Sequence, residues 1–189
     1  MVELTKPLIS GTEGYAEQAD ALVDRYESRS FAEIYTRVLP LLPKAPGWVL
    51  NIGAGTGRDA AGFAALGYDV VAVEPTRAMP AHAERLHPSP RIEWIDGSLP
   101  DLACLASRQG SFHGVMMTDM WMHLDPLQRR TAMPNVARLL ARGGGVCWHC
   151  HYAKAPYRRG GGCSTFGQRG YPTCQRRRFI GGVQYGRIN

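Results

Sequence analysis

The stretch VLNIGAGTGRDA, residues 49–60, decides the fold of this chain. The apolar run 48–52 has the length and composition of a buried strand. Gly53, Gly55 and Gly57 follow it directly, and without side chains they let the backbone turn sharply and approach a ligand closely. A buried strand that runs into a glycine-rich turn is typical of the ligand-binding edge of an open α/β sheet.

Strands and helices alternate along the chain up to residue 145. Three further apolar runs are consistent with buried strands, at 69–74, 92–95 and 114–118. Helical patterns separate the strands, at 58–66, 76–86 and about 131–141. Pro134 suits only the first turn of a helix, so we expect the last helix to begin as late as Thr131. This alternation predicts an α/β fold with a doubly wound, mostly parallel sheet and helices on both faces.

Two helical segments precede the first strand. Apolar residues recur at helical spacing from Tyr15 to Tyr26, which predicts an amphipathic helix. Ser30 and Glu33 form a capping box at the start of a second helix. We assign residues 1–45 to N-terminal helices that form a lid over the ligand-binding edge.

Length and composition are those of one globular domain, which we assign to residues 1–152. The chain has 189 residues, of which 44% are hydrophobic and 20% are charged. No apolar run approaches the roughly 20 residues that span a membrane, and the N-terminus lacks the pattern of a secretory signal. The odd number of cysteines, five, favours a reducing compartment over a disulfide scaffold. We therefore expect a cytoplasmic protein without membrane contact.

Charge divides the chain into two parts. The whole sequence has 22 Lys and Arg against 16 Asp and Glu, but no acidic residue follows Asp125. Residues 146–189 contain eight basic residues, whereas residues 1–145 are slightly acidic. The basic balance therefore comes from the end of the chain alone. We assign residues 153–189 to a basic tail, rich in glycine and arginine, that is expected to be irregular.

Glu74 ends the second predicted strand, seventeen residues after Gly57. A carboxylate at this position of an open sheet can accept hydrogen bonds from both hydroxyls of a ribose. Arg58 stands where the dinucleotide fingerprint GxGxxG requires a third glycine, and this argues against a nicotinamide dinucleotide. The turn and the acid together indicate a ligand that contains a ribose.

Four successive motifs, VLNIGAGTGRDA, DVVAVEP, IEWIDGSLPDL and GVMMTDMWMHLD, resemble those of the class I S-adenosylmethionine-dependent methyltransferases. The resemblance covers roughly residues 15–145, with the motifs in the family's order and spacing. It implies S-adenosylmethionine as the cofactor, S-adenosylhomocysteine as its product, and methyl transfer to an acceptor that the motifs do not identify. A small-molecule acceptor fits best, because residues 1–145 are slightly acidic and show no basic groove for nucleic acid.

The resemblance also implies roles for individual residues. The methionine part of the cofactor would lie against Asn51, Gly53, Ala54, Gly55, Gly57 and Arg58. The ribose would be bound at Glu74 and Pro75, and the adenine near Asp96, Gly97 and Ser98. Thr118 and Asp119 would border the methyl group. Asn51 and Gly97 depart from the family's pattern, since acids are usual at both positions.

Asp119 and His123 are the candidate catalytic residues beside the transferred methyl group. His123 has the chemistry of a general base, which is needed only if the acceptor nucleophile arrives protonated. An ordinary packed or helix-capping histidine is the competing interpretation. A second class of function also stays open, namely a non-catalytic cofactor-binding remnant or an RNA-binding protein that uses the basic tail.

Cysteines and histidines near the tail raise the question of a zinc site. The candidate ligands are Cys147, His149, Cys150, His151, Cys163 and Cys174. The first two cysteines form a Cys-x-x-Cys pair, but ten residues separate the last two. Structural zinc sites usually combine two closely spaced pairs, so we expect no metal site.

A change of reading frame after about residue 145 explains the break in pattern best. The family's fifth strand should follow the glycines at 143–145 as a dense apolar run, but VCWHCHY stands there. Read one nucleotide earlier, the codons of residues 147–152 specify Leu-Ala-Leu, then serine or proline, then leucine, which is the alternation of a strand. We expect a sheet that is incomplete at its C-terminal edge, and this edge would be open to pairing in a homodimer.

Overall fold

The fold is described from a computed structural model of the chain. The described residues are 19–36, 38–42, 44–76, 78–149, 174–180 and 183–188. The helices are α1 (Ala19–Glu27), α2 (Phe31–Tyr35), α3 (Arg58–Ala65), α4 (Ala78–Leu86) and α5 (Pro126–Leu139). Three short 3-10 helices are η1 (Leu39–Leu41), η2 (Ala103–Leu105) and η3 (Trp121–His123). None of these described helices is both long and apolar enough to cross a membrane.

Seven strands form one sheet in the described part of the chain. They are β1 (Trp48–Ile52), β2 (Asp69–Val73), β3 (Ile92–Ile95), β4 (Phe112–Thr118), β5 (Leu140–His149), β6 (Cys174–Ile180) and β7 (Val183–Ile188). Their order is β3-β2-β1-β4-β5-β7-β6. The first five strands in this order run parallel, and β7 pairs antiparallel with β5 and β6. The predicted doubly wound, mostly parallel sheet is confirmed.

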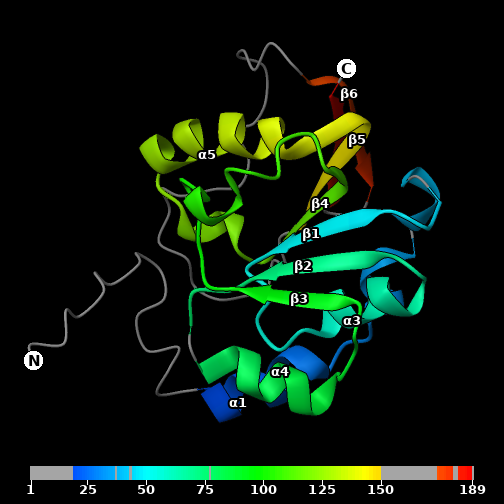
Figure 1. Cartoon of the computed structure of the whole chain (residues 1–189), viewed down its shortest axis with the longest axis vertical. Helices are drawn as coiled ribbons and strands as arrows, with labels where there is room; N and C mark the ends of the chain where they lie inside the picture. The colour runs from blue at the N-terminus through cyan, green and yellow to red at the C-terminus, as the bar shows by residue number, and fades with distance from the viewer. Residues whose placement is uncertain are drawn as a thin grey trace, which may run out of the picture.

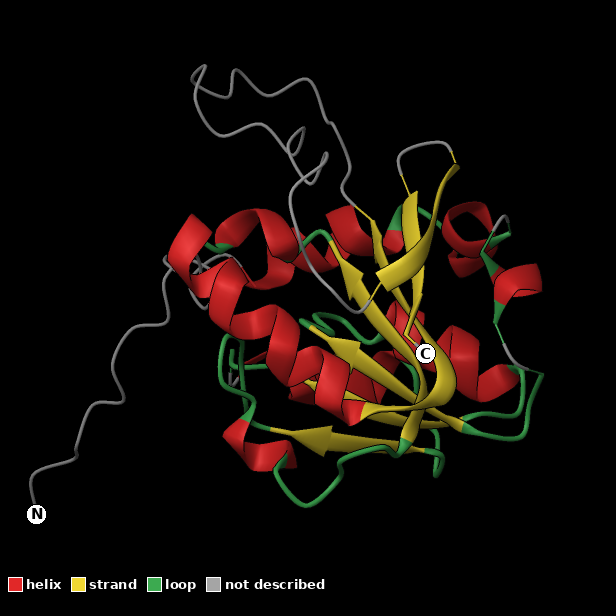
Figure 2. Cartoon of the chain, turned by 90° about the horizontal axis from the view of Figure 1, so that it is seen from above, coloured by secondary structure: helices red, strands yellow, loops and turns green. Residues whose placement is uncertain are grey.

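Helices cover both faces of this sheet. α5 lies over one face, and α1, α3 and α4 lie on the other side (Figure 1). Figure 2 shows the same layers in a view turned by 90°. This arrangement follows from right-handed crossovers, since the chain moves outward in one direction from β1 to β3 and in the other direction from β4 to β5.

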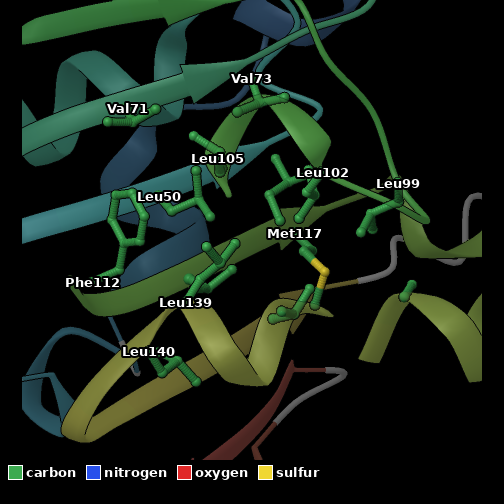
Figure 3. Close-up of a cluster of buried hydrophobic side chains, with 14 of the residues drawn as sticks. Leu50, Val71, Val73, Leu99, Leu102, Leu105, Phe112, Met117, Leu139 and Leu140 are labelled. Atoms are coloured by element: carbon green, nitrogen blue, oxygen red, sulfur yellow. The ribbon is translucent and has the colours of Figure 1, made fainter. Parts of the chain in front are cut away.

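Alternating strand residues pack two hydrophobic layers. The layer under α5 includes Leu50, Ile52, Val71, Val73, Val115, Met117, Val136 and Leu139. Figure 3 shows Leu50, Met117 and Leu139 from this layer, between the strands and α5. The opposite layer includes Tyr35, Val49, Ala60, Phe63, Val70 and Met116. Because both faces are buried, the central strands are mostly apolar, as parallel strands usually are.

An aromatic cluster joins α2 to α3. The ring centroids of Phe31, Tyr35 and Phe63 lie between 4.8 and 5.0 Å apart. Gly62 on α3 permits this packing, because a Cβ at its position would overlap the Phe31 ring. The cluster holds α2 against the helix that follows the glycine-rich turn.

The N-terminal helices agree with the sequence where they are described. The capping box at α2 is confirmed, with Ser30 N donating to Glu33 Oε2 at 2.7 Å and Glu33 N donating to Ser30 Oγ at 3.3 Å. α1 includes Tyr26, whereas Tyr15 lies outside the described residues.

α5 begins earlier than the sequence predicts. Asp125 Oδ1 accepts hydrogen bonds from the backbone N–H groups of Leu127 at 2.7 Å and Gln128 at 2.8 Å. The Gln128 side chain accepts one in return from Asp125 N at 2.9 Å, which completes a capping box. The expected start near Thr131 is wrong, because this cap stabilises the first turn and Pro134 removes only one donor farther along the helix.

The end of the chain forms two strands, which corrects the expectation of an irregular tail. β7 pairs with β5 from Val183 to Arg187, and β6 pairs with β7. Backbone N–H and C=O groups make the hydrogen bonds between these strands. The strands can therefore form although the sequence shows no alternation of apolar and polar residues there. Gly181 and Gly182 between the two strands are a hairpin signal that sequence reasoning missed.

The C-terminal edge of the sheet also differs from the one expected. β7 occupies the free side of β5, so the outer strand is β6 and the sheet is not cut off at β5. The expected homodimer relied on an unpaired β5 edge, and β7 occupies that edge. Dimerisation stays a prediction, but this edge no longer supports it. The change of reading frame also stays a prediction, and residues 150–173 lie outside the described residues.

Candidate active site

The carboxyl ends of β1, β2 and β4 meet at one edge of the sheet. The backbone N–H groups of Gly53 and Ala54 both donate to the carbonyl of Val73, at 2.9 and 3.1 Å. Gly53 also packs closely on the segment after β4, since a Cβ at Gly53 would lie 2.9 Å from Met120 Cβ. The turn after β1 therefore touches both neighbouring strand ends, which is where open α/β sheets bind ligands.

The glycine-rich turn has the backbone that its sequence predicts. Gly53, Gly55 and Gly57 have φ values of +69°, +53° and +83°. Residues with a Cβ rarely adopt these values, so glycine is required for the shape of the turn. Gly57 is the left-handed residue that precedes the first turn of α3.

Glu74 lies directly after β2 and connects it to this turn. Its side chain is 7% exposed, with Oε2 accepting from Gly55 N and Oε1 accepting from Thr76 N, both at 2.9 Å. Each carboxylate oxygen keeps a further lone pair, so two ribose hydroxyls can still be accepted. Pro75 follows Glu74 and is half-buried. Glu74 therefore orders the turn as well as presenting a carboxylate beside it.

Asn51 supplies a buried acceptor near the end of β1. Its side chain is 1% exposed, and Oδ1 has no hydrogen-bond partner among the described residues. A buried polar atom without a partner is unfavourable, and such an atom in a native site needs an explanation, for example a bound donor. The Asn51 carbonyl oxygen therefore fits a ligand group that donates hydrogen bonds.

α1 is attached to the glycine-rich turn by three contacts. The Tyr26 ring lies 3.6 Å from the position of a Cβ on Gly55. Arg58 Nη1 donates to the Tyr26 carbonyl at 2.5 Å, and Thr56 Oγ1 donates to Glu27 Oε1 at 2.5 Å. These contacts put the end of α1 over the turn, while the role of the N-terminal segment as a lid stays a prediction.

A buried polar network, missed by sequence reasoning, connects α2, α3 and β4. Arg58 Nε donates to Asp59 Oδ1 at 2.7 Å, and Tyr35 Oη donates to Asp59 Oδ2 at 3.0 Å. Tyr35 Oη also lies 2.6 Å from Thr118 Oγ1. Burial alone would lower the pKa of Arg58, but the charge and hydrogen bond of Asp59 outweigh it and the pKa is raised. An acidic residue on the first turn of α3, Asp59, was the one sign of this network that the sequence offered.

The residues after β4 reach the same edge. Thr118 is the last residue of β4 and is half-buried. Asp119 follows with φ of +52°, a left-handed value that is unusual outside glycine and is often found at functional sites. His123 ends η3 and is half-buried. The catalytic roles expected for Asp119 and His123 stay predictions.

The loop after β3 contains the residues expected near the adenine. Asp96 is exposed, and Ser98 is half-buried. Gly97 has a packing reason, because a Cβ there would lie 2.5 Å from Cys104 Sγ on η2 and 3.2 Å from Val73 Cγ1. An acidic residue at position 97 would therefore require the Cys104 or Val73 side chain to move, and the adenine contact itself stays a prediction.

The described residues contain no group of three or more His, Cys, Asp or Glu side chains that could hold a metal ion. Of the zinc candidates, Cys147 and His149 lie in β5 and Cys174 lies in β6. Cys150, His151 and Cys163 lie outside the described residues.

Comparison with known families agrees with the geometry of this edge. A model described as a methyltransferase domain matches residues 49–144, which include β1 from Val49 onward, the glycine-rich turn, Glu74 and β4. The chain belongs to this methyltransferase domain family. The match therefore covers most of the elements that build the candidate site.

Two similar relatives are named as uncharacterized methyltransferases, one from Mycobacterium tuberculosis and one from Mycobacterium bovis. This methyltransferase domain is 31% identical to each over 118 residues, which cover 58% of this chain and 42% of the relative. The chain thus spans less than half the length of the curated relatives it matches.

Solved structures resemble the fold. A protein of Pyrococcus horikoshii has a TM-score of 0.56 at 25% identity, over 65% of this chain and 57% of that one. A TehB-like S-adenosylmethionine-dependent methyltransferase from Corynebacterium glutamicum has a TM-score of 0.56 at 17% identity, over 70% of this chain and 72% of that one. The second likeness concerns the fold alone.

Proposed function

We propose that this chain binds S-adenosylmethionine and transfers its methyl group to a small-molecule acceptor. The observation that carries the proposal is the pairing of Glu74 with the backbone of Gly55, which joins a ribose-binding carboxylate to a glycine-rich turn at the carboxyl edge of the sheet. Membership of the methyltransferase domain family supports the same reaction.

The residues at this edge fit the parts of the cofactor. The unpartnered Oδ1 of Asn51 suits the methionyl ammonium, which needs acceptors. The turn of Gly53, Ala54, Gly55 and Gly57 would lie against the methionine part, because its three glycines have no side chains to intrude on a ligand. Glu74 with Pro75 would hold the ribose, and Asp96, Gly97 and Ser98 the adenine. Arg58 takes part through the turn, because its guanidinium is engaged with Asp59 and the Tyr26 carbonyl.

The cofactor supplies an electrophilic methyl group on a sulfonium, so the protein's main task is to place the acceptor in line with it. Thr118 ends β4 and Asp119 follows it, where the acceptor would enter. Asp119 and His123 are the candidates for removing a proton from an acceptor that arrives protonated. The acidic balance of residues 1–145 favours a small acceptor over nucleic acid, and an RNA-binding role would rest on the basic tail alone.

Calorimetry with S-adenosylhomocysteine tests the cofactor site. Gly55→Val should abolish binding, because the side chain would intrude at the turn and glycine is needed at φ of +53°. Gly110→Val is the matched control, since Gly110 has φ of +67° and nothing within 4 Å of a Cβ position. Both variants should remain folded by circular dichroism. Tight binding by Gly55→Val, or no binding by the unaltered chain, would contradict the proposed site.

A further inference from the structure

We infer that Tyr35 accepts the hydrogen bond of the Thr118 hydroxyl, so that Thr118 Oγ1 offers only lone pairs to the site. The methyl-accepting substrate would then present an N–H or O–H group to Thr118 Oγ1. The inference rests on the proposed function and deepens it. In this inference Tyr35 is a positioning residue and Thr118 selects the methyl acceptor. The substrate class is a nitrogen or oxygen nucleophile that carries a proton.

The direction of the protons follows from counting donors. A carboxylate can only accept, so the hydrogen bond between Tyr35 Oη and Asp59 Oδ2, at 3.0 Å, uses the single phenolic proton. Tyr35 Oη and Thr118 Oγ1 are 2.6 Å apart, and Tyr35 has no second proton to give. Thr118 must therefore donate to Tyr35. Its own proton is committed, and only lone pairs remain on Oγ1 for any other partner.

Burial makes this direction firm. Tyr35 is 1% exposed and Asp59 is 5% exposed, so water cannot readily replace either partner. Arg58 Nε donates to the other oxygen of Asp59 at 2.7 Å, so both carboxylate oxygens of Asp59 accept hydrogen bonds. In a low-dielectric surrounding, a satisfied polar network of this kind is costly to rearrange. The network therefore sets the role of Thr118 before any ligand binds.

Thr118 is where this network reaches the ligand-binding edge. It is the last residue of β4 and is half-buried, whereas Tyr35 is buried in the layer between the sheet and α3, and Asp59 is buried on the first turn of α3. Lone pairs attract an N–H or O–H group and repel an anion. An amine, amide or alcohol nucleophile therefore fits beside Thr118, and a carboxylate or phenolate does not.

The transfer step balances for such a nucleophile. A lone pair of the acceptor nitrogen or oxygen forms the new bond to the methyl carbon. The bond between carbon and sulfur breaks with its electron pair left on sulfur, which becomes a neutral thioether. The proton of the N–H or O–H group that was hydrogen-bonded to Thr118 then leaves the methylated nitrogen or oxygen and is released to water. Thr118 orients this proton and, with its own proton committed to Tyr35, takes no part in acid–base chemistry.

Two cofactor analogues test the inference without a known substrate. Sinefungin carries a primary ammonium where the sulfonium methyl would be, so it places donors at the reacting position. S-adenosylhomocysteine has no donor there. Calorimetry on the unaltered chain should show tighter binding of sinefungin, and the ratio of the two dissociation constants is the quantity to follow.

The variants distinguish the loss of the hydrogen-bond acceptor at Thr118 from a general loss of side-chain packing. Thr118→Val keeps the shape and removes the lone pairs, so the preference for sinefungin should fall about tenfold, since hydrogen bonds to charged groups are the strong ones. Thr118→Ser keeps the hydroxyl and should restore the preference. Tyr35→Phe should lower it several-fold. Tyr68→Phe is the matched control, because Tyr68 is also buried in the same layer but lies just before β2.

Each result has one meaning. An unchanged ratio in both Thr118→Val and Tyr35→Phe would overturn the inference and leave the cofactor site intact. Equal weakening of both analogues in Tyr35→Phe would make Tyr35 merely structural, which also overturns its positioning role. If the unaltered chain binds neither analogue, the proposed function itself fails. Circular dichroism and urea unfolding on each variant exclude loss of the fold.

Discussion

Glu74 Oε2 accepts a hydrogen bond from Gly55 N at 2.9 Å, across nineteen positions of sequence. The bond ties the end of β2 to the turn after β1, and Glu74 Oε1 is held in turn by Thr76 N at 2.9 Å. A single buried carboxylate therefore organises the backbone of the turn and the place expected for the ribose. Changes at Glu74 should affect ligand binding through both.

Glu74→Ala should weaken binding of S-adenosylhomocysteine at least tenfold in calorimetry, because hydrogen bonds to a charged group contribute roughly 1.5–3 kcal/mol each. Glu74→Gln should also weaken it, since its amide nitrogen would face a backbone N–H in place of a carboxylate oxygen. Glu93→Gln is a matched control, as Glu93 on β3 pairs with Arg108. Unchanged affinity in folded Glu74→Ala would remove Glu74 from the site.

Gly62→Ala should destabilise the chain by about 1–3 kcal/mol in urea unfolding, because the added Cβ overlaps the Phe31 ring. Helix propensity alone predicts the opposite sign, by about 1 kcal/mol. In a Phe31→Ala background the clash is absent, so Gly62→Ala should there become stabilising. A stabilising effect in the unaltered background would show that the ring can move aside at little cost.

Asp125→Ala should lower stability by about 1 kcal/mol, because the first turn of α5 loses the acceptor of two backbone N–H groups. Asp125→Asn should retain most of the stability, since asparagine is an equally good N-cap. Urea midpoints of the three proteins measure the difference. Equal loss in both variants would point to the charge of Asp125 and not to its cap.

The capping box of α2 should make stability depend on acid pH. The Ser30 backbone N–H, and then the Ser30 hydroxyl, lower the pKa of Glu33 from its usual 4.5. A carboxyl with a lowered folded-state pKa contributes stability above its unfolded pKa, and this is lost as pH falls through the folded value. Urea midpoints between about pH 3 and 6 should fall less steeply in Glu33→Gln than in the unaltered chain. Parallel curves would contradict the assignment.

The sequence by itself determined the strand–turn–helix unit at 48–66 and the parallel sheet around it. These features depend on local properties, namely apolar runs for β1 and β2, and glycines where φ must be positive at the turn. Their signals lie within a few neighbouring residues, so they can be read without knowing what packs against them.

The strands at the end of the chain were decided by the tertiary structure. β6 contains three successive arginines, which give no apolar alternation. Its pairing partner is β7, and β7 is held in turn by the free side of β5. Edge strands of an antiparallel pair form through backbone hydrogen bonds, so their presence depended on whether an unpaired edge was available.

The polarity of the site was decided by contacts between distant residues. Tyr35 is separated from Asp59 by 24 positions and from Thr118 by 83. Sequence could place Thr118 at a strand end, but a hydroxyl can donate or accept, and nothing local chooses between the two. That choice is made when α2 packs on α3 and buries the Tyr35 phenol against a carboxylate that can only accept.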